Sequence, residues 1–350
     1  MVFVINSSIV RNLAAECGFD LAGVAMPYPV PDFGRFRDWV DRGLAGEMRY
    51  LTDHRAEVRN DPARLLPGVR SIICVGLVYN GLEPYSTRFD DPERSWISRY
   101  AWGDDYHRVV REKLKGLKRK LLEIRQFSSR ISVDTAPLLE RSLARQAGLG
   151  WIGRNTCLIN QQLGSWFFLG ELLTTLEIEP DELDSVPPDR CGTCTRCIDA
   201  CPTAAIVPSP DGQFELDPRL CISYFTIELR SAIPEEQRAA VGKHVFGCDI
   251  CQDVCPWNRR AAETSEPAFL PREFAPELER MAGITEAEFR EMFRNTPVSR
   301  AKYRGFLRNV VVAMGNSRLE KFREPLEKLA ASEDPLVAEH AEWALRALTG

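Results

Sequence analysis

The stretch Cys191-Gly-Thr-Cys194-Thr-Arg-Cys197-Ile-Asp-Ala-Cys201-Pro202 decides the fold of the centre of the chain. Its spacing is C-x2-C-x2-C-x3-C-P, in which a short turn of backbone presents three thiolates to one [4Fe–4S] cubane and the fourth cysteine points to a neighbouring cluster. A second run, Cys248-Asp-Ile-Cys251-Gln-Asp-Val-Cys255-Pro256, lacks one close cysteine, which Cys221 can supply. The sequence therefore predicts a ferredoxin-like domain that holds two [4Fe–4S] clusters.

Exchange of ligands between the two runs, as in two-cluster ferredoxins, assigns each thiolate to one cluster. Cluster one is expected to take Cys191, Cys194, Cys197 and Cys255, and cluster two Cys201, Cys221, Cys248 and Cys251. A pair of zinc sites is the alternative, because C-x2-C pairs also bind zinc. The cysteine block has no well-placed histidine and each run ends in Cys-Pro, which favours iron and sulfide over zinc.

Composition sets limits on the rest of the 350-residue chain, which is 44% hydrophobic and has a formal net charge of -5. This length allows two or three domains, and the acidic balance does not suggest a general nucleic-acid binder. Residues 1–10 lack the basic start and long apolar run of a secretory leader, and the apolar stretches 71–79 and 166–176 are too short to span a bilayer. We therefore expect a cytoplasmic protein without membrane contact, whose reduced cysteines serve as metal ligands.

The first 180 residues have the pattern of a mixed α/β domain. Residues 71–79, SIICVGLVY, form a near-continuous apolar run that is typical of a central strand covered on both faces. Other strands are predicted at 20–25, 131–134 and 166–178, and helices at 8–17, 33–42, 105–126 and 138–147.

A Pro- and Asp-rich break at 179–190 precedes the cysteine block, and helical periodicity dominates from about residue 285. Helices are predicted at 298–314, 319–331 and 335–348, with Gly315-Asn316 and Glu333-Asp334-Pro335 between them. This pattern resembles stacked helical pairs of the HEAT type. The sequence thus predicts three domains, at 1–180, 181–270 and 271–350.

Several long motifs together resemble those of the epoxyqueuosine reductases. They cover nearly the whole chain: residues 99–107 (RYAWGDDYH), 133–141 (VDTAPLLER), 148–156 (GLGWIGRNT), 221–228 (CISYFTIE), 247–258 (GCDICQDVCPWN) and 308–316 (RNVVVAMGN). That family more usually has lysine at the position of Arg154.

The resemblance implies an oxidoreductase that reduces epoxyqueuosine to queuosine at the wobble base of tRNA, using cobalamin beside two [4Fe–4S] clusters. Its partners would be tRNA carrying epoxyqueuosine and an external low-potential electron donor, and we expect a monomer. Residues 1–180 would then be the corrinoid-binding catalytic domain, 181–270 the two-cluster domain and 271–350 the tRNA-binding region. The corrinoid motif D-x-H-x-x-G is absent, since Asp105-Tyr106-His107 continues as Arg108-Val-Val.

Asp134 matches the aspartate that donates a proton in this family. At the end of a strand beside a flat macrocycle its carboxyl would be partly desolvated, which raises a carboxyl pKa as a general acid requires. The alternative is that Asp134 is the N-cap of the helix that follows.

The resemblance also suggests residues that line the corrinoid: Arg59, Tyr100, Ala101, His107, Asp134, Gly153, Asn155 and Asp249. Glycine would let the backbone approach a planar ring closely. The ordinary alternatives are a helix-start residue for His107, turn chemistry for the Gly153 region and a solvated loop carboxylate for Asp249.

A tRNA face is expected between residues 290 and 324, where nine basic and three acidic residues give a local charge of +6. Arg300, Arg304 and Arg308 recur at four-residue intervals, with Lys302 and Tyr303 nearby. Such a stripe can follow an RNA backbone, although a solvated helical face is the alternative.

Two other functions remain open from the residues. A corrinoid reductive dehalogenase shares the cluster block, but such proteins are typically exported with a twin-arginine leader, which this sequence lacks. A ferredoxin-like electron carrier without its own substrate would need little beyond the cysteine block.

Overall fold

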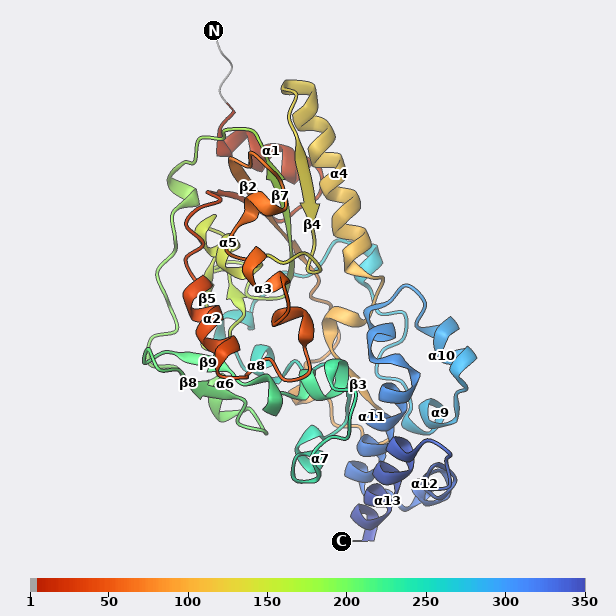
Figure 1. The fold of residues 1–350 in the computed structure, drawn as a ribbon. Coiled ribbons are helices and arrows are strands. Elements are labelled where there is room, and N and C mark those ends of the chain that lie inside the picture. The colour runs from red at the N-terminus through yellow and green to blue at the C-terminus, as the bar shows by residue number, and fades with distance from the viewer. Residues whose placement is uncertain (1–4, 350) are drawn as a thin grey trace. The chain divides into compact units, whose positions relative to one another are not determined.

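The computed structural model describes residues 5–349, so the first four residues of the stretch 1–10 lie outside the described part (Figure 1). The chain divides into two compact units, each assembled from three separate stretches of sequence. Unit 1 contains the residues up to Asn80, Tyr106–Cys194 and Cys255–Pro267. Unit 2 contains Gly81–Asp105, Thr195–Val254 and the residues from Ala268 onward.

A four-stranded antiparallel sheet forms the centre of unit 1. Its strand order is β1 (Leu21–Ala25), β2 (Ser71–Val78), β7 (Phe167–Thr174) and β4 (Ser129–Ser132). All eight residues of β2 are buried, which confirms the prediction of a central strand covered on both faces. The strand predicted at 131–134 ends two residues earlier, which leaves Asp134 in the turn that follows β4.

Helices α4 (Tyr106–Ile124) and α5 (Glu140–Gln146) cover opposite faces of this sheet. A Cβ atom on Gly170 of β7 would meet Val110 and Leu114 of α4. Phe167 and Leu173 of β7 instead share a core cluster with Leu143 and Ala144 of α5. Because alternate residues of a strand point to opposite faces, the odd-numbered positions of β7 face α5. The remaining helices and strands of unit 1 are α1 (Ser7–Glu16), α2 (Phe33–Asp41), α3 (Arg55–Val58), β5 (Trp151–Ile152) and β6 (Leu158–Ile159).

Unit 2 combines two small sheets with a bundle of helices. Strands β8 (Ile206–Pro208) and β9 (Phe214–Leu216) form an antiparallel hairpin, and β3 (Trp96–Ile97) pairs in parallel with β10 (His244–Phe246). The helices are α6 (Arg196–Asp199), α7 (Glu235–Val241), α8 (Ile250–Asp253), α9 (Leu278–Gly283), α10 (Glu286–Met292), α11 (Lys302–Ser317), α12 (Arg323–Ala330) and α13 (Pro335–Thr349).

Helix α11 is the central helix of unit 2 and packs against α9, α13 and β10. The predicted break at Gly315-Asn316 is wrong, because α11 continues to Ser317. A Cβ atom on Gly315 would lie 2.7 Å from Cα of Ala344, so the glycine serves close packing of α11 against α13. Within the described residues, no helix has both the length and the apolar character that crossing a bilayer requires.

Candidate active site

The turn after β4 places Asp134 in a strained and accessible position. Asp134 has a left-handed backbone with φ of 57°, and Thr135 N–H donates to the Val133 carbonyl across it at 2.6 Å. The Asp134 side chain is 47% exposed, and its Oδ2 lies 3.2 Å from Nε2 of His107. Its backbone N–H donates to Oε1 of Glu140 at 2.6 Å. A non-glycine residue keeps such a backbone only when neighbouring contacts hold it there.

The helix-cap alternative for Asp134 is wrong, because α5 begins at Glu140 and its N-cap is Leu139. The polypeptide leaves nearly half of the Asp134 side chain exposed. Desolvation of this carboxyl by a macrocycle stays a prediction.

His107 is the second residue of α4 and stands 27 positions before Asp134 in the chain. The fold brings the two side chains together, since α4 packs on the sheet whose β4 edge leads into the Asp134 turn. A carboxylate and an imidazole within hydrogen-bond reach can hold and pass a proton.

Two further carboxyl groups belong to this neighbourhood and were missed from the sequence. Burial, followed by the negative charge of Asp134, raises the pKa of Glu140 to about 8. Burial and the charge of Glu140 raise the pKa of Glu171, on β7, well above its usual range. The sequence did offer one indication of Glu171, because it is a glutamate within the otherwise apolar run Phe167–Thr174.

The other unit 1 candidates for corrinoid contact are mostly engaged within the protein. Arg59 is buried, donates to the carbonyl of Arg55 at 2.9 Å and stacks over the Phe36 ring. A Cβ atom on Gly153 would lie 2.5 Å from Cδ1 of Ile159, so a larger residue there would require the Ile159 side chain to shift. Asn155 is buried, and its Oδ1 accepts from Cys157 N–H at 3.2 Å.

Tyr100, Ala101 and Asp249 belong to unit 2. Tyr100 and Ala101 lie in the 3-10 turn Arg99–Ala101, where Ala101 is buried and the Tyr100 ring lies 6.0 Å from that of Phe246. The solvated-loop alternative for Asp249 is wrong, because only 2% of the residue is exposed. Its carboxylate accepts hydrogen bonds from Trp96 Nε1, Ser98 Oγ and Arg99 N–H.

Three of the predicted cluster cysteines, Cys191, Cys194 and Cys255, lie in unit 1. Cys255 forms a small core with Trp151 and Ile159, against which Cys191 packs, although the two cysteines are far apart in sequence. Arg154 donates to the carbonyl of Gly192 at 2.7 Å, so its guanidinium stabilises the loop between Cys191 and Cys194. Burial raises the pKa of Cys255 to about 11, and iron would supply the positive charge that a buried thiolate needs.

The other five cysteines, Cys197, Cys201, Cys221, Cys248 and Cys251, lie in unit 2. Cys221 and Cys248 have thiol pKa values raised chiefly by burial, and Cys201 adds to both shifts. Ala205 N–H points at Sγ of Cys201 at 3.3 Å, and such N–H bonds tune the potential of a cluster. None of these cysteines forms a disulfide in the described chain. Within the same described residues, no three His, Cys, Asp or Glu side chains are already gathered closely enough to hold a metal ion.

The predicted tRNA residues other than Arg308 are accessible in unit 2, and two of them are ion-paired. Arg300 lies in the 3-10 turn Pro297–Ala301, before α11, and pairs with Glu228 at 2.7 Å. Lys302 is exposed at the start of α11, and Arg304 pairs with Asp334 at 2.7 Å. Tyr303 is half-buried and donates to the carbonyl of Ile284. These residues offer cations at the surface, although local carboxylates reduce their net charge.

The placement of Arg308 on this exposed face is wrong. Arg308 is 0% exposed, and its guanidinium donates to the carbonyls of Phe225, Leu229 and Ser231. Arg308 therefore joins α11 both to the π-helical turn Tyr224–Glu228 and to the residues that follow it. The four-residue spacing predicted that Arg300, Arg304 and Arg308 share one exposed helix face. Arg300, however, lies outside α11, and the side of α11 that carries Arg308 is buried.

Replacing Arg308 with methionine should lower the free energy of unfolding by about 3 kcal/mol, because three buried carbonyls lose their donors. The matched control is Arg304→Met on the exposed part of α11, where removal of a surface pair should cost at most about 1 kcal/mol. Urea unfolding followed by circular dichroism measures both variants. Equal stability of the two variants would contradict the buried role of Arg308.

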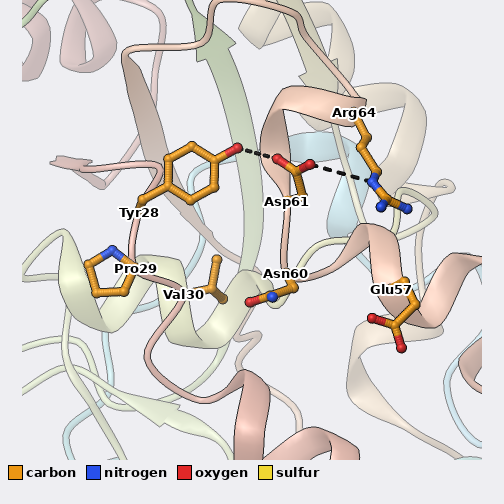
Figure 2. A pocket seen from close by; sticks show the side chains of 7 residues that line it. All are labelled: Tyr28, Pro29, Val30, Glu57, Asn60, Asp61 and Arg64. Carbon is orange, nitrogen blue, oxygen red and sulfur yellow. Dashed lines mark hydrogen bonds and ion pairs between the residues drawn. The ribbon is translucent and has the colours of Figure 1, made fainter.

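A separate surface hollow of about 570 Å³ lies beside α3 in unit 1 (Figure 2). At its rim Tyr28 donates to Asp61, which also pairs with Arg64 at 3.4 Å. The lining residues are Tyr28, Pro29, Val30, Glu57, Asn60, Asp61 and Arg64. This hollow includes none of the residues predicted for the site, so it is distinct from the Asp134 turn.

Two family models match parts of this chain. Residues 190–258 match a 4Fe-4S double cluster binding domain, which covers all eight predicted ligands. Residues 59–135 match the model described as epoxyqueuosine reductase QueG, DUF1730, which ends just past Asp134.

Curated relatives match along almost the full length. The epoxyqueuosine reductase of Xanthomonas campestris pv. campestris is 41% identical over 96% of this chain and 94% of its own length. That of Escherichia coli (strain K12) is 36% identical over 96% of this chain and 88% of its own. The chain belongs to the epoxyqueuosine reductase family. Membership makes it a reductase enzyme, so the electron-carrier alternative is wrong, and it favours this family over the dehalogenases.

Solved epoxyqueuosine reductases share the fold. One, described in complex with an epoxyqueuosine-modified stem loop of tRNA-Tyr, superimposes with a TM-score of 0.88 at 29% identity, covering 98% of this chain and 90% of that one. Another, from Bacillus subtilis, has a TM-score of 0.85 at 29% identity over 97% of this chain and 90% of its own. Its catalytic aspartate loop is described as swung out of the active site. The mixed α/β fold and the double-cluster domain are thus those of an epoxyqueuosine reductase.

Proposed function

We propose that this chain reduces the epoxide of epoxyqueuosine in tRNA to the alkene of queuosine. Family membership over 96% of the chain supports this reaction. The observation that carries the proposal is the accessible Asp134 carboxylate, held on a strained turn within reach of His107. We place the reaction in the cytoplasm, with an external low-potential electron donor and a monomeric enzyme.

The net reaction takes up two electrons and two protons and releases the epoxide oxygen as water. Cobalamin, when bound, would supply a strongly reducing cobalt centre, and the two clusters would deliver electrons to it one at a time. Asp134 would protonate the departing oxygen, since it is the exposed acid of the turn. His107, 3.2 Å from Oδ2, would orient that carboxyl and exchange protons with it.

The exposed part of the Asp134 side chain is compatible with a site in which a bound cofactor and substrate cover this carboxylate. Nearly half of its side chain is exposed, so a macrocycle and the substrate base lying over it would supply the missing desolvation. We propose that Arg59, Tyr100, Ala101, Gly153, Asn155 and Asp249 contact the corrinoid. Arg59 is a buried cation whose positive charge acts on Glu140, which places it near the Asp134 turn.

We propose three functional regions along the chain: a corrinoid-binding catalytic region at 1–180, a two-cluster region at 181–270 and a HEAT-like tRNA-binding region at 271–350. Cluster one would be held by Cys191, Cys194, Cys197 and Cys255, and cluster two by Cys201, Cys221, Cys248 and Cys251. The packing of Cys191 against the Cys255 core in unit 1 supports exchange of ligands between the two runs.

The direct test is anaerobic incubation of the purified protein with cobalamin, a chemical reductant and tRNA that contains epoxyqueuosine. Nucleoside mass analysis should show conversion to a product lighter by one oxygen atom. Samples without cobalamin and samples without reductant are the controls. An unchanged nucleoside, in protein that carries its full iron and cobalamin, would refute the proposed reaction.

The exposed cations Arg300, Lys302 and Arg304, with the Tyr303 ring, are proposed to contact the tRNA. The double variant Lys302→Ala/Arg304→Ala should bind tRNA several-fold more weakly at low salt. The slope of log affinity against log salt should become shallower by about 0.7 to 0.9 for each phosphate that the protein no longer neutralises. Filter binding over a salt series measures both effects.

The matched control for the tRNA face is Lys328→Ala on α12, an exposed lysine paired with Glu324. It removes one surface cation from the same unit without touching α11. If the double variant and this control share one affinity and one salt slope, the start of α11 does not bind the tRNA.

A further inference from the structure

A buried glutamate lies inside the sheet of unit 1, next to the Asp134 turn. Glu171 stands in the middle of β7, opposite Cys74 of β2 and Ser132 of β4. It is 0% exposed. Since odd-numbered residues of β7 face α5, its side chain points to the face where Glu140 begins that helix.

Glu140 connects this buried group to the catalytic turn. Its Oε1 accepts the backbone N–H of Asp134 at 2.6 Å, six residues back along the chain. The left-handed conformation of Asp134 is unfavourable for a non-glycine residue, so the turn needs outside contacts to keep its shape. The Glu140 carboxylate is such a contact, and it acts on the backbone without occupying the Asp134 side chain.

Ionising both carboxyls would place two like charges side by side, one of them fully buried, so the second ionisation is strongly disfavoured. Neither oxygen of Glu171 lies in hydrogen-bond geometry with a donor among the described residues, although Glu140 is the neighbour that acts on it most strongly. A proton on Glu171 would let it donate an O–H···O bond to Glu140. Glu140 would then keep the negative charge that its contact with the Asp134 N–H favours.

Other charged or titratable groups also act on the pair. They are Asp134 in the turn, His107 on α4, Arg59 at the end of α3 and Cys74 on β2. The Asp134 charge opposes ionisation of Glu140, whereas His107 and Arg59 favour it. These opposing charges are consistent with one negative charge on the Glu140–Glu171 pair.

We propose that Glu140 and Glu171 share one proton and act together as a positioning group for the Asp134 turn, with protonated Glu171 donating to Glu140 and Glu140 holding the Asp134 amide. This role rests on the proposed function, because the position of Asp134 matters only if Asp134 protonates the substrate. A positioning group of this kind is also compatible with a turn that can leave the active site, as described for the Bacillus subtilis relative.

The shared proton has a direct spectroscopic test that needs no substrate. Infrared spectra at neutral pH should contain the C=O stretch of protonated carboxylic acid, and Glu171→Gln should lower the intensity of this band. The matched control Glu177→Gln, an exposed glutamate in the same unit, should keep the full intensity. Absence of the band from the parent protein, or equal intensity in Glu171→Gln and Glu177→Gln, would overturn the assignment.

Stability should also follow pH with a defined sign. Glu171, which keeps the shared proton, binds it more tightly in the folded protein than in the unfolded chain, so its contribution to stability is full below pH 4.5, the ordinary glutamate pKa. This contribution diminishes as the pH rises above 4.5 toward the raised pKa of Glu171. The fall in melting temperature across this range should be smaller in Glu171→Gln than in Glu177→Gln, and equal falls would count against the pair.

The positioning role is tested by kinetics together with amide exchange. Glu140→Ala should lower kcat at least tenfold, leave KM for tRNA within about twofold and speed hydrogen exchange at residues 133–136. Glu171→Leu should do the same to a smaller extent, and Glu171→Gln should regain most of the kcat because its amide can donate to Glu140. Unchanged kcat and exchange in Glu140→Ala would overturn the role.

Failure of the inference and failure of the proposed function give different results. The infrared band and the exchange changes could appear as expected in a protein that does not reduce epoxyqueuosine. That result would refute the proposed function and, with it, the catalytic purpose of the Glu140–Glu171 pair. Normal reduction in Glu140→Ala would refute the positioning role of the pair and leave the proposed function intact.

Discussion

Replacing Asp134 with asparagine is expected to lower turnover by about two to four orders of magnitude, the usual contribution of a general acid. Asparagine has nearly the same shape and tolerates a left-handed backbone better than most residues, so the φ of 57° remains accessible. The backbone hydrogen bond to Glu140 is also retained, because it uses the Asp134 amide. The variant lacks only the acidic proton that the epoxide oxygen needs.

Single-turnover conversion of epoxyqueuosine tRNA, followed by nucleoside mass analysis, measures this effect. Iron content, cobalamin binding and tRNA affinity should equal those of the parent. Asp38→Asn is the matched control, since Asp38 is an exposed aspartate of α2 that pairs with Arg42. Turnover within about threefold of the parent in Asp134→Asn would exclude a general-acid role for this residue.

Replacing Cys221 with alanine is expected to remove one cubane, so that iron falls from about eight to about four atoms per chain. Cys221 stands apart from both cysteine runs in sequence, yet its thiol interacts with Cys201 in unit 2, and both act on Cys248. Turnover should fall by at least about 100-fold, because the proposed electron route to the reaction centre passes through both clusters.

Cys157→Ala provides a sharp comparison. The Cys157 thiol acts electrostatically on Cys255 in unit 1, but the spacing of the two runs leaves Cys157 without a ligand role. Its removal should leave iron content and the absorbance of the clusters unchanged. Loss of iron in Cys157→Ala together with full iron in Cys221→Ala would reverse the ligand assignment.

Local spacing was enough to predict the features whose parts lie close together in sequence. The C-x2-C-x2-C-x3-C-P run places its thiolates within one turn of backbone. The apolar run at 71–79 required cover on both faces and forms the fully buried β2. The long helix at 105–126 was visible because Val110, Leu114, Leu117 and Leu121 recur at helical spacing.

The same periodicity misassigned residues whose surroundings come from distant segments. Arg308 has the spacing of an exposed stripe, but carbonyls from Phe225 to Ser231 surround its guanidinium. Gly315 has the composition of a helix end, but it lies inside α11 because Ala344 packs on it. In both cases the deciding neighbour is tens of residues away along the chain.

The sequence by itself determined the cluster ligands as candidates, the central strand and the family, because these depend on residue types at fixed short intervals. Only the tertiary structure decided that Asp134 is exposed on a left-handed turn, that His107 reaches it, that Glu140 accepts its backbone N–H and that Glu171 is buried in the neighbouring strand. The physical reason is that burial, charge and hydrogen-bond partners are properties of three-dimensional neighbours, which no local pattern specifies.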